Sequence, residues 1–388
     1  MGGPERRGAD RRPELHPGAV PQRVAPPPGA GRRSRRGPGR AARRHHGVVA
    51  GVTSPLRLTD IAAQAQVSEA TVSRVLNGKP GVAAGTRHKV LAALDLLGYE
   101  RPVRLKRRSN GLVGLLIPEL TNPIFPAFAQ VIEQALAGHG YTPVLCTQTP
   151  GGATEDELVE QLEERGVTGI VFLSGLHADA HADPSRYQRL AARGTPFVLI
   201  NGFNEQVNAP FISPDDRAAA DMAVRHLEDL GHRRIGLAIG PTRYVPSARK
   251  EQGFLAAVPS AESEGLIQRT LFTVEGGHAA GMALLERGCT GIVCGSDPMA
   301  LGVIRAARER GLRVPEDVSV VGFDDSPLIA FTDPPLTTVR QPVRAMATAA
   351  VGALLEAVSG TPVQRTEYVF QPELVVRGST SAPPTRSL

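Results

Sequence analysis

Apolar residues recur at helical spacing in three successive short segments of the chain. The first predicted helix begins near Thr59, which can cap its N-terminus, the second runs from Ser68 to about Leu76, and the third from Thr86 to Gly98. The residues expected to face inward are Leu58, Ile61, Ala62 and Ala65, then Val72, Val75 and Leu76, then Val90, Leu91, Leu94 and Leu97. Three helices with a tight connection between the first two predict a helix-turn-helix domain over residues 54–100.

The pattern changes at Gly111 to continuous apolar runs that alternate with helical segments. A helix from about Phe125 to His139 separates the first two runs, and the runs are LVGLLIP, TPVLCTQ, TGIVFLS, PFVLING, RIGLAIG, GIVCGS and VSVVGF. Runs without polar alternation are typical of strands buried on both faces, so they predict parallel sheets covered by helices. Their number over residues 111–378 indicates two similar α/β lobes. The predicted fold is multi-domain, with an all-α helix-turn-helix headpiece before a two-lobed α/β core.

Charge divides the chain in the same way. Residues 1–53 hold 12 Lys and Arg against 3 Asp and Glu, residues 54–110 have a net charge of +6, and residues 111–388 have a net charge of −9. A basic front on an acidic body indicates that the front meets a polyanion. Segment 1–53 is rich in Arg, Pro and Gly, so we expect a disordered extension, either a phosphate-binding arm or a segment without a function. Residues 101–110 form a basic linker, and residues 379–388 a tail.

The exposed side of the second predicted helix differs from an ordinary solvated surface. It carries small polar groups and one long cation, Arg74, and it lacks mixed Lys and Glu. Small side chains let a helix approach the bases of the major groove, where an arginine can bind guanine through two hydrogen bonds and Glu69 can accept from cytosine. The alternative is an amphipathic helix of a plain three-helix bundle, which accounts for the apolar side but not for the polar one.

Polar and aromatic residues follow the predicted strands of the core. They are Asn122, Phe125, Asn201, Asp297 and Asp324, while Lys250 and Phe272 lie near predicted helix starts. Ligands of parallel α/β folds bind beyond the carboxyl ends of the strands. Carboxylates, amides, a cation and aromatic rings together suit a polyhydroxylated ring. Structural alternatives are that Asp297 caps a helix, Asp324 closes a turn and Phe272 belongs to the core.

The segment LTDIAAQAQVSEATVSRVLNGKPGVAAGTRHKVLAALDLLGY closely resembles the DNA-binding headpiece of the LacI (lactose-repressor) family. The resemblance extends through nearly all of residues 56–378, and it includes LVGLLIPELTNPIF, GSDPMALGVIRAARERGLRVPEDVSVVGFDD and DPPLTTVRQP. It implies a ligand-controlled transcription factor, usually a dimer, whose core has the fold of periplasmic sugar-binding proteins.

The resemblance also implies roles for single residues. Base contacts fall on Glu69, Ala70 and Arg74. Leu105 falls where the family inserts a leucine wedge into the minor groove, but the linker is shorter than in well-known members, and a basic tether is the alternative. The candidate DNA-binding residues are Thr59, Ser68, Glu69, Ala70, Thr71, Ser73, Arg74, Asn77, Leu105 and Lys106.

The effector cleft of the family would contain Phe125, Lys250, Phe272 and Asp297. Family members often have arginine where this chain has Lys250, and a lysine cannot offer the same planar pair of donors. With the residues that follow strands, the candidate effector-binding set is Asn122, Phe125, Asn201, Lys250, Phe272, Asp297 and Asp324.

Several functional classes lack their sequence signals. No Walker loop, HExxH, GxSxG or metal-ligand spacing is present, and Cys146, Cys289 and Cys294 are scattered, so we expect no enzyme, no cofactor and no metal site. No apolar run reaches the length of about 18 residues that indicates a membrane span, and no signal peptide is evident, so we expect a cytoplasmic protein.

The leading hypothesis is a DNA-binding transcriptional regulator and repressor. It would act as a homodimer on double-stranded operator DNA under the control of a small sugar-like effector. Two alternatives remain open at this point, namely a solute-binding protein for transport and a sugar-modifying enzyme that uses Asp297 and Asp324.

Overall fold

The chain divides into two compact units, one ending at Arg101 and the other beginning at Pro102. The computed structural model describes residues 57–76, 79, 81–97, 109–148, 151–258, 263–362 and 364–384. Segment 1–53, most of the linker 101–110, and the candidate residues Asn77, Leu105 and Lys106 lie outside the described residues.

The small unit contains the three predicted helices. They are α1 (Leu58–Ala65), α2 (Glu69–Leu76) and α3 (Ala84–Leu96). One core joins them, formed by Ile61, Ala62, Ala65, Val72, Val75, Val90 and Ala93. Ser68 caps α2 as predicted, because its Oγ accepts from the Thr71 amide at 3.2 Å. The second helix therefore starts at a defined residue, with its apolar side turned inward.

Two details of the headpiece prediction are wrong. Thr59 lies inside α1 and does not cap it, since the helix begins one residue earlier and the Arg57 amide donates to the Asp60 carboxylate at 2.8 Å. Leu91 is exposed, and Ala93 takes the buried position on α3. Steps of three and four residues from Val90 reach Ala93 but not Leu91, which is rotated away from the core by about 100°.

The large unit contains two six-stranded sheets. The strand orders are β11-β5-β4-β3-β1-β2 and β12-β10-β9-β8-β6-β7, and every pairing is parallel except that of β12 with β10. The strands are β1 (Gly111–Ile117), β2 (Tyr141–Thr147), β3 (Gly169–Leu173), β4 (Phe197–Ile200), β5 (Pro210–Pro214), β6 (Ile235–Ile239), β7 (Ile267–Arg269), β8 (Gly291–Cys294), β9 (Ser319–Asp324), β10 (Thr337–Arg340), β11 (Thr366–Phe370) and β12 (Glu373–Val375). All seven apolar runs form strands, which confirms the two-lobed prediction.

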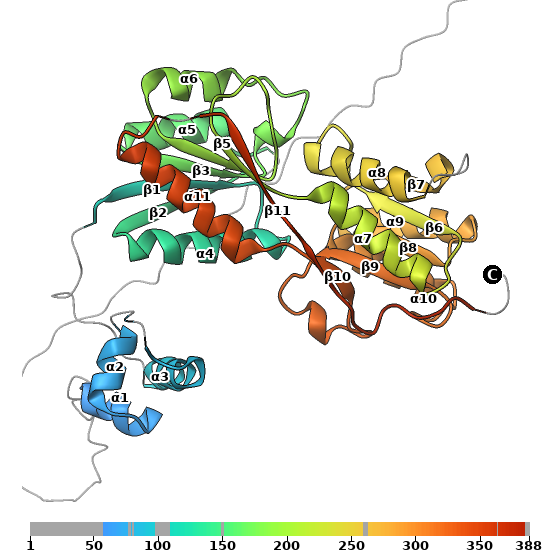
Figure 1. Cartoon of the computed structure of the whole chain (residues 1–388), viewed down its shortest axis with the longest axis horizontal. Coiled ribbons are helices and arrows are strands. Elements are labelled where there is room, and N and C mark those ends of the chain that lie inside the picture. Colours follow the sequence, from blue (N-terminus) through green and yellow to red (C-terminus); the bar gives the residue numbers. More distant parts are fainter. Residues whose placement is uncertain are drawn as a thin grey trace, which may run out of the picture. The chain divides into compact units, whose positions relative to one another are not determined.

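Helices cover both faces of each sheet (Figure 1). They are α4 (Ile124–Gly138), α5 (Glu155–Glu164), α6 (Ser185–Arg193), α7 (Asp216–Asp229), α8 (Val245–Ala257), α9 (Val274–Glu286), α10 (Asp297–Glu309) and α11 (Val343–Val358), with short 3₁₀ turns η2 (Leu176–Ala178), η3 (Ser263–Leu266) and η4 (Ile329–Phe331). In the first lobe α4 and α11 share one core with the sheet, and α5 and α6 share the other. In the second lobe α7 and α8 lie opposite α9 and α10.

Strand alternation explains why both faces of each sheet are apolar. Along β1, Val113, Leu115 and Ile117 point into the core with α4 and α11, whereas Leu116 points into the core with α5. Because successive side chains meet different helical layers, most positions of a strand in the middle of the sheet are apolar. Thr337 and Thr338 on β10 are exceptions, and both are buried.

The chain crosses between the lobes three times. It passes from β5 to α7, returns from β10 to α11, and passes again from β11 to β12. At the first crossing the Asp215 amide donates to the Phe370 carbonyl at 2.8 Å, which ties two crossings together. Arg249 on α8 and Glu367 on β11 form a two-point ion pair between the lobes, at 2.6 and 3.0 Å. The lobes are thus joined by a hinge made of three crossing segments of the chain.

The segment Ser379–Pro384, which we expected to lie outside the core as a tail, is part of the second lobe. Ser379 is fully buried, and its hydroxyl accepts from the Thr337 amide at 2.8 Å and donates to the Val320 carbonyl at 2.6 Å. The Ser381 carbonyl lies 2.9 Å from Nε2 of the buried His232. These contacts hold the last described residues against β9 and β10.

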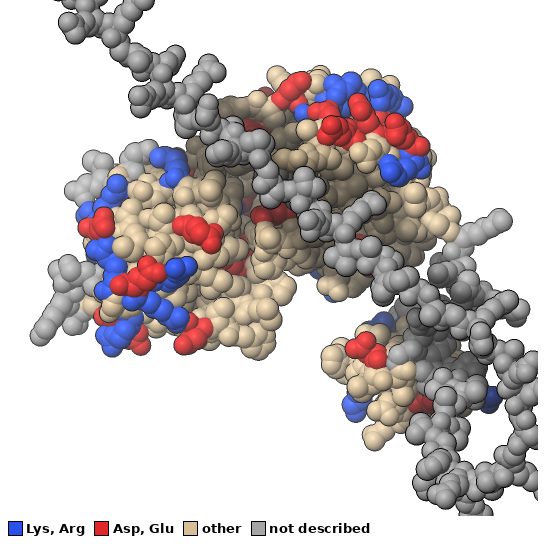
Figure 2. All heavy atoms as spheres, turned by 180° about the vertical axis from the view of Figure 1, so that it is seen from behind, with Lys and Arg blue, Asp and Glu red and all other residues tan. Residues whose placement is uncertain are grey.

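Acidic and basic side chains are interspersed on the face of the large unit that Figure 2 shows. On α5 and α6 they form ion pairs, such as Arg189 with Asp156 at 2.8 Å and Arg193 with Glu163 at 2.6 Å. A surface that binds phosphates would carry mainly positive charge, and this face does not.

Among the described residues no helix is long and apolar enough to cross a membrane.

Candidate functional site

The exposed side of α2 gathers most of the candidate DNA-binding residues. Ser68, Glu69, Ala70 and Arg74 are exposed, and Thr71 and Ser73 are half-buried. Val72 and Val75 point the other way, into the headpiece core. The helix therefore presents one continuous surface of small and polar side chains, with Arg74 as its long cation. Thr59 is exposed as well, but on α1.

The N-terminal turn of α2 has an internal hydrogen-bond arrangement. The hydroxyls of Ser68 and Thr71 lie 2.9 Å apart, and the Ser68 hydroxyl also accepts from the Thr71 amide. A hydroxyl that is fixed in this way keeps its position relative to the helix axis. This turn can present Glu69 and Ala70 in a defined orientation to a groove or a phosphate.

A second site is a cavity of about 660 Å³ between the two lobes of the large unit. This volume falls within the range of roughly 300–1,000 Å³ for small-molecule sites. The cavity lies beyond the carboxyl ends of the strands, where parallel α/β folds bind ligands. Six of the seven candidate effector residues line it, namely Asn122, Phe125, Asn201, Lys250, Phe272 and Asp324. Four of them, Asn122, Phe125, Asn201 and Asp324, were placed after strand ends from the sequence, and Lys250 and Phe272 were placed near helix starts.

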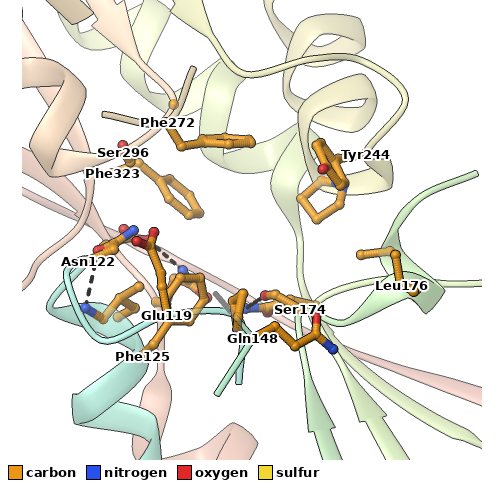
Figure 3. Close-up of a pocket in the computed structure, with 18 of the residues that line it drawn as sticks. Glu119, Asn122, Phe125, Gln148, Ser174, Leu176, Tyr244, Phe272, Ser296 and Phe323 are labelled. Carbon is orange, nitrogen blue, oxygen red and sulfur yellow. Dashed lines mark hydrogen bonds between the residues drawn. The ribbon is translucent and has the colours of Figure 1, made fainter. Parts of the chain in front are cut away.

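Aromatic rings form both walls of the cavity (Figure 3). Phe272, Phe323 and Tyr244 come from the second lobe, and Phe125 comes from the first. The ring centroids of Tyr244 and Phe272 are 6.1 Å apart. An aromatic face can cover the apolar C–H face of a flat ring, so these walls fit a ligand that is polar at its edge and apolar on its faces.

Asp297 is not a lining residue, which differs from the expectation. Its carboxylate is fully buried, where Oδ2 accepts from the Ser326 amide at 2.7 Å and Oδ1 accepts from the Thr338 hydroxyl at 2.6 Å. Gly322 leaves room for it, since an added Cβ there would collide with Oδ1. The cap of α10 is Ser296, not Asp297. Asp297 therefore joins α10 to β9 and β10 inside the second lobe.

Asp324 lies at the hinge end of the cavity. Its Oδ1 accepts from Gln341 Nε2 at 2.6 Å, and the Asn122 side chain of the other lobe also donates to it. Burial raises the pKa of Asp324 well above its ordinary value, and the charge of Asp297 raises it further. Burial also raises the pKa of Asp297, to about 6. Of this pair, Asp324 is the carboxyl that favours its neutral form.

Lys250 forms a buried ion pair with Asp216, and both side chains line the cavity. The Lys250 Nζ also lies 3.7 Å from the centre of the Phe323 ring. Burial raises the pKa of Asp216, whereas the Lys250 ammonium lowers it. The cation is held at one place by a carboxylate and by an aromatic face, which leaves it able to donate to a ligand oxygen.

All four described amide side chains that line the cavity have their NH₂ groups bonded to protein oxygens, with Asn122 donating to Asp324. Gln148 donates to Glu155 at 2.9 Å, Gln341 to Asp324 at 2.6 Å, and Asn201 to the Ser174 hydroxyl at 3.3 Å. The carbonyl oxygens of Asn201 and Gln341 are buried and have no hydrogen-bond partner among the described residues. An unpaired buried acceptor is costly, so these two oxygens lack a donor that buried acceptors in folded proteins usually have.

Three residues at the same strand ends have a strained, left-handed backbone conformation. Ser174, Asn201 and Asp324 have φ values of +48°, +61° and +120°, and all three line the cavity. Left-handed conformations are costly for residues other than glycine, and they persist at sites where the surrounding structure holds a side chain in one direction. Here they aim Ser174 and Asn201 into the cavity.

Several lining residues were missed from the sequence. Ser174 directly follows TGIVFL, and Gln148 ends TPVLCTQ, so the rule used for Asn201 applies to both. Gln341 and Asp216 follow short strands that the pattern did not reveal. Tyr244 and Phe323 carried no signal of their own, because aromatic residues of this kind usually belong to a core.

Comparison with known proteins gives consistent matches. The family model of bacterial regulatory proteins, lacI family, matches residues 57–101, and the periplasmic binding protein-like domain matches residues 224–380. An HTH-type transcriptional regulator from the aml 5′ region of Streptomyces limosus is 76% identical over 331 residues, covering 84% of this chain and 94% of the relative. The regulator MalR of Streptomyces coelicolor is 68% identical, covering 84% and 97%. The ribose operon repressor of Halalkalibacterium halodurans is 31% identical, covering 83% and 96%.

Solved structures give the same result. A complex of the transcriptional regulator CelR with cellobiose matches with a TM-score of 0.62 and 32% identity, covering 84% of this chain and 99% of that one. The lac repressor dimer bound to operator and the anti-inducer ONPF matches with a TM-score of 0.61 and 28% identity, covering 85% and 100%.

Proposed function

Because the chain belongs to the LacI family and is a DNA-binding transcriptional regulator, we propose that α2 reads the bases of its operator and that the interlobe cavity binds a neutral saccharide as effector. The observation that carries the effector proposal is the pair of unpartnered carbonyl oxygens, Asn201 Oδ1 and Gln341 Oε1, in a cavity with aromatic walls. Acceptors of this kind select ligands rich in hydroxyl donors.

The charges of the cavity favour an uncharged ligand. Lys250, the one lysine among the described lining residues, is neutralised by Asp216. Glu155 is paired with Arg186 at 3.6 Å, and the carboxylate of Glu119 adds negative charge. A phosphorylated sugar would need a free cation or a cluster of backbone amides, and the described lining residues offer no unpaired arginine or lysine. The relatives support a saccharide as well, since CelR is complexed with cellobiose and another LacI family regulator with ribose.

The operator would be read by a dimer, as in the lac repressor complex. Two headpieces on a two-fold axis bind two half-sites of a pseudo-palindrome. Arg74 and Glu69 would select bases, and the hydroxyls of Ser68, Thr71 and Ser73 would contact phosphates or support those contacts. We further propose that the protein acts as a repressor in the cytoplasm, without a catalytic step.

Effector control would act through the hinge. Lys250, Asp216, Asp324 and Gln341 border both the cavity and two of the crossings between the lobes. A ligand that contacts them binds one lobe arrangement more tightly than another, and this difference in affinity is the coupling energy that changes DNA binding.

Binding and control can be tested together. Purified full-length protein is screened by thermal shift against neutral sugars, sugar phosphates and nucleosides, and each ligand that raises the melting temperature is added to a gel-shift assay with selected operator DNA. A ligand at 100 times its dissociation constant contributes roughly 2.7 kcal/mol to stability. The proposal predicts that only neutral saccharides stabilise the protein and alter operator binding, and stabilisation by sugar phosphates or nucleosides alone would contradict it.

A further inference from the structure

The end of the cavity away from the hinge is a separate polar region. Figure 3 shows Gln148, Ser174 and Leu176 together there, opposite Tyr244, whereas Asn122 lies at the other end. The Ser174 hydroxyl accepts from Asn201, so its own proton is free for another acceptor. Gln148 is turned so that its NH₂ faces Glu155, which leaves its carbonyl oxygen for the cavity. This end thus offers a donor and acceptors to a second polar group.

Glu155 holds this end in place. It is the first residue of α5 and is almost fully buried. Its carboxylate accepts from Gln148 Nε2 at 2.9 Å, from the Leu176 amide at 2.9 Å and from the Tyr187 hydroxyl at 2.5 Å. The N-terminus of a helix stabilises an anion, so the carboxylate suits this position. One side chain therefore fixes both the Gln148 amide and the η2 turn.

The η2 turn continues into a contact between the lobes, which we name the clasp (Asp179 and Ala180 with Arg243 and Tyr244). Asp179 and Tyr244 form an isolated antiparallel bridge, and the Ala180 amide donates to the Arg243 carbonyl at 2.8 Å. Arg243 Nε lies 3.4 Å from Asp179 Oδ2, and its guanidinium lies 4.9 Å from the Tyr244 ring centre. Because Leu176 and Tyr244 line the cavity, the clasp is the boundary of its far end.

We propose that the region of Gln148, Ser174 and Asn201 is a subsite for a second sugar ring, and that the clasp closes this subsite and so limits the length of the saccharide that the protein accepts. The inference rests on the proposed saccharide effector and concerns the number of sugar rings that this effector has. The hinge end, with Lys250 and Asp324, takes one ring. The second ring donates hydroxyls to Gln148 and Asn201 and accepts from Ser174. A third ring meets the clasp and requires it to open.

The test is a titration of full-length protein with neutral glucose oligomers of one to five units, in the malto and cello series, by isothermal calorimetry. The second ring is expected to improve the dissociation constant at least about tenfold through its two or three hydrogen bonds. The four- and five-unit sugars are expected to bind at least about tenfold more weakly than the disaccharide, since they must break the clasp.

Variants separate the two parts of the proposal. Gln148→Leu should reduce the gain from the second ring at least about fivefold, since one acceptor is lost. Arg243→Ala should lower the ratio of the four-unit to the two-unit dissociation constant at least about fivefold. Arg243 is half-exposed and contributes little to folding, so this variant should fold. Asp179→Asn is a second clasp variant, which changes the other side of the same ion pair. Arg225→Ala, which removes an exposed ion pair on α7, is the matched control and should leave both ratios unchanged.

The outcomes are distinguishable. Sugars that bind with no gain from the second ring would overturn the subsite, and wild-type protein that accepts five units as readily as two would overturn the clasp. In both cases the saccharide effector stands. Length ratios that stay the same in both clasp variants would also overturn the clasp. If no sugar of either series binds, this inference is overturned, and the thermal-shift screen of other neutral sugars decides whether the saccharide effector stands.

Discussion

Lys250 on α8 donates a hydrogen bond to Asp216, the first residue of α7, and both side chains face the cavity. The pair is nearly fully buried, and Asp216 follows directly on the first crossing between the lobes. A buried ion pair contributes little net stability, because desolvation offsets the attraction. We therefore assign the pair a role in effector control. A ligand oxygen that accepts a hydrogen bond from Lys250 also changes the interaction of Lys250 with Asp216, the residue at which the chain enters the second lobe.

Replacement of Lys250 by methionine should destabilise the protein. Asp216 would be left as an uncompensated buried charge, at a cost of about 3–5 kcal/mol. Urea unfolding at pH 7 measures this loss, with Lys250→Arg as the variant that keeps the charge. The double variant Lys250→Met/Asp216→Leu should recover most of the stability. A loss below about 1 kcal/mol in the single variant would show that the pair is not sealed from water.

Asp297 should give a pH dependence that runs against that of ordinary carboxylates. Its pKa is raised from 3.8 to about 6 in the folded state, so the folded protein keeps a proton that the unfolded chain releases between about pH 4 and pH 6. Its contribution to the free energy of unfolding therefore falls as the pH rises through this window. The Asp297→Asn variant, which stays neutral, should gain up to about 3 kcal/mol relative to wild type between pH 4 and pH 7.

The difference between variant and wild type must be measured, because His177 has the opposite effect. Burial lowers the pKa of His177 from 6.5 to about 4, so the unfolded chain binds the extra proton and stability rises with pH across the same window. Urea unfolding of both proteins at pH 4.5, 5.5 and 7 cancels the His177 contribution, and the difference then reports the pH response of the Asp297 carboxyl, including its effect on the pKa of Asp324. A difference that does not change with pH would mean that its carboxylate is already ionised at pH 4.5.

Substitution of Gly240 by alanine should weaken effector binding without affecting DNA binding. An added Cβ would overlap the Phe272 ring, which forms one wall of the cavity. The ring is the end of a side chain and can turn away, so the protein should fold while the effector dissociation constant rises about 2–10-fold. Calorimetry measures the effect, and Gly352→Ala, at an open position on α11, is the control. Unchanged binding would exclude Phe272 as a ligand contact.

Arg74 should contribute to sequence preference and not only to affinity. Its replacement by alanine should cost about 1–3 kcal/mol on operator DNA and relax the preference at one base pair of each half-site. Lys89→Ala on α3 removes the same charge from an exposed position and serves as the control. Fluorescence anisotropy on operator and random duplexes measures both. Equal weakening on the two duplexes would assign Arg74 to a phosphate.

Much of the fold could be predicted from the sequence, because long apolar runs such as VSVVGF can only be buried between two layers of helices. The short strands β5, β7, β10, β11 and β12 could not. Three of them are edge strands with half-exposed positions, and β5 begins and ends with proline. Their place in the sheets is decided by contacts with residues far away in the chain, as for β11, which pairs with β5.

The site was predictable where one strand end supplied one residue, as for Asn122 and Asn201. Asp297 shows the limit of that rule, because Ser326 and Thr338 turn its carboxylate away from the cavity, and both come from later elements. The clasp between Asp179 and Arg243 joins loops that are distant in sequence and have no pattern of their own. Contacts between lobes have to be seen in three dimensions.

Base reading by α2 is tested by selection of DNA with the full-length protein from a pool of random duplexes, followed by sequencing of the bound fraction. We expect enrichment of a two-fold symmetric motif. The Arg74→Ala protein should tolerate other bases at one position of each half-site and keep the rest of the motif. Salt-sensitive binding of every duplex without an enriched motif would contradict the assignment of α2 as the helix that reads bases.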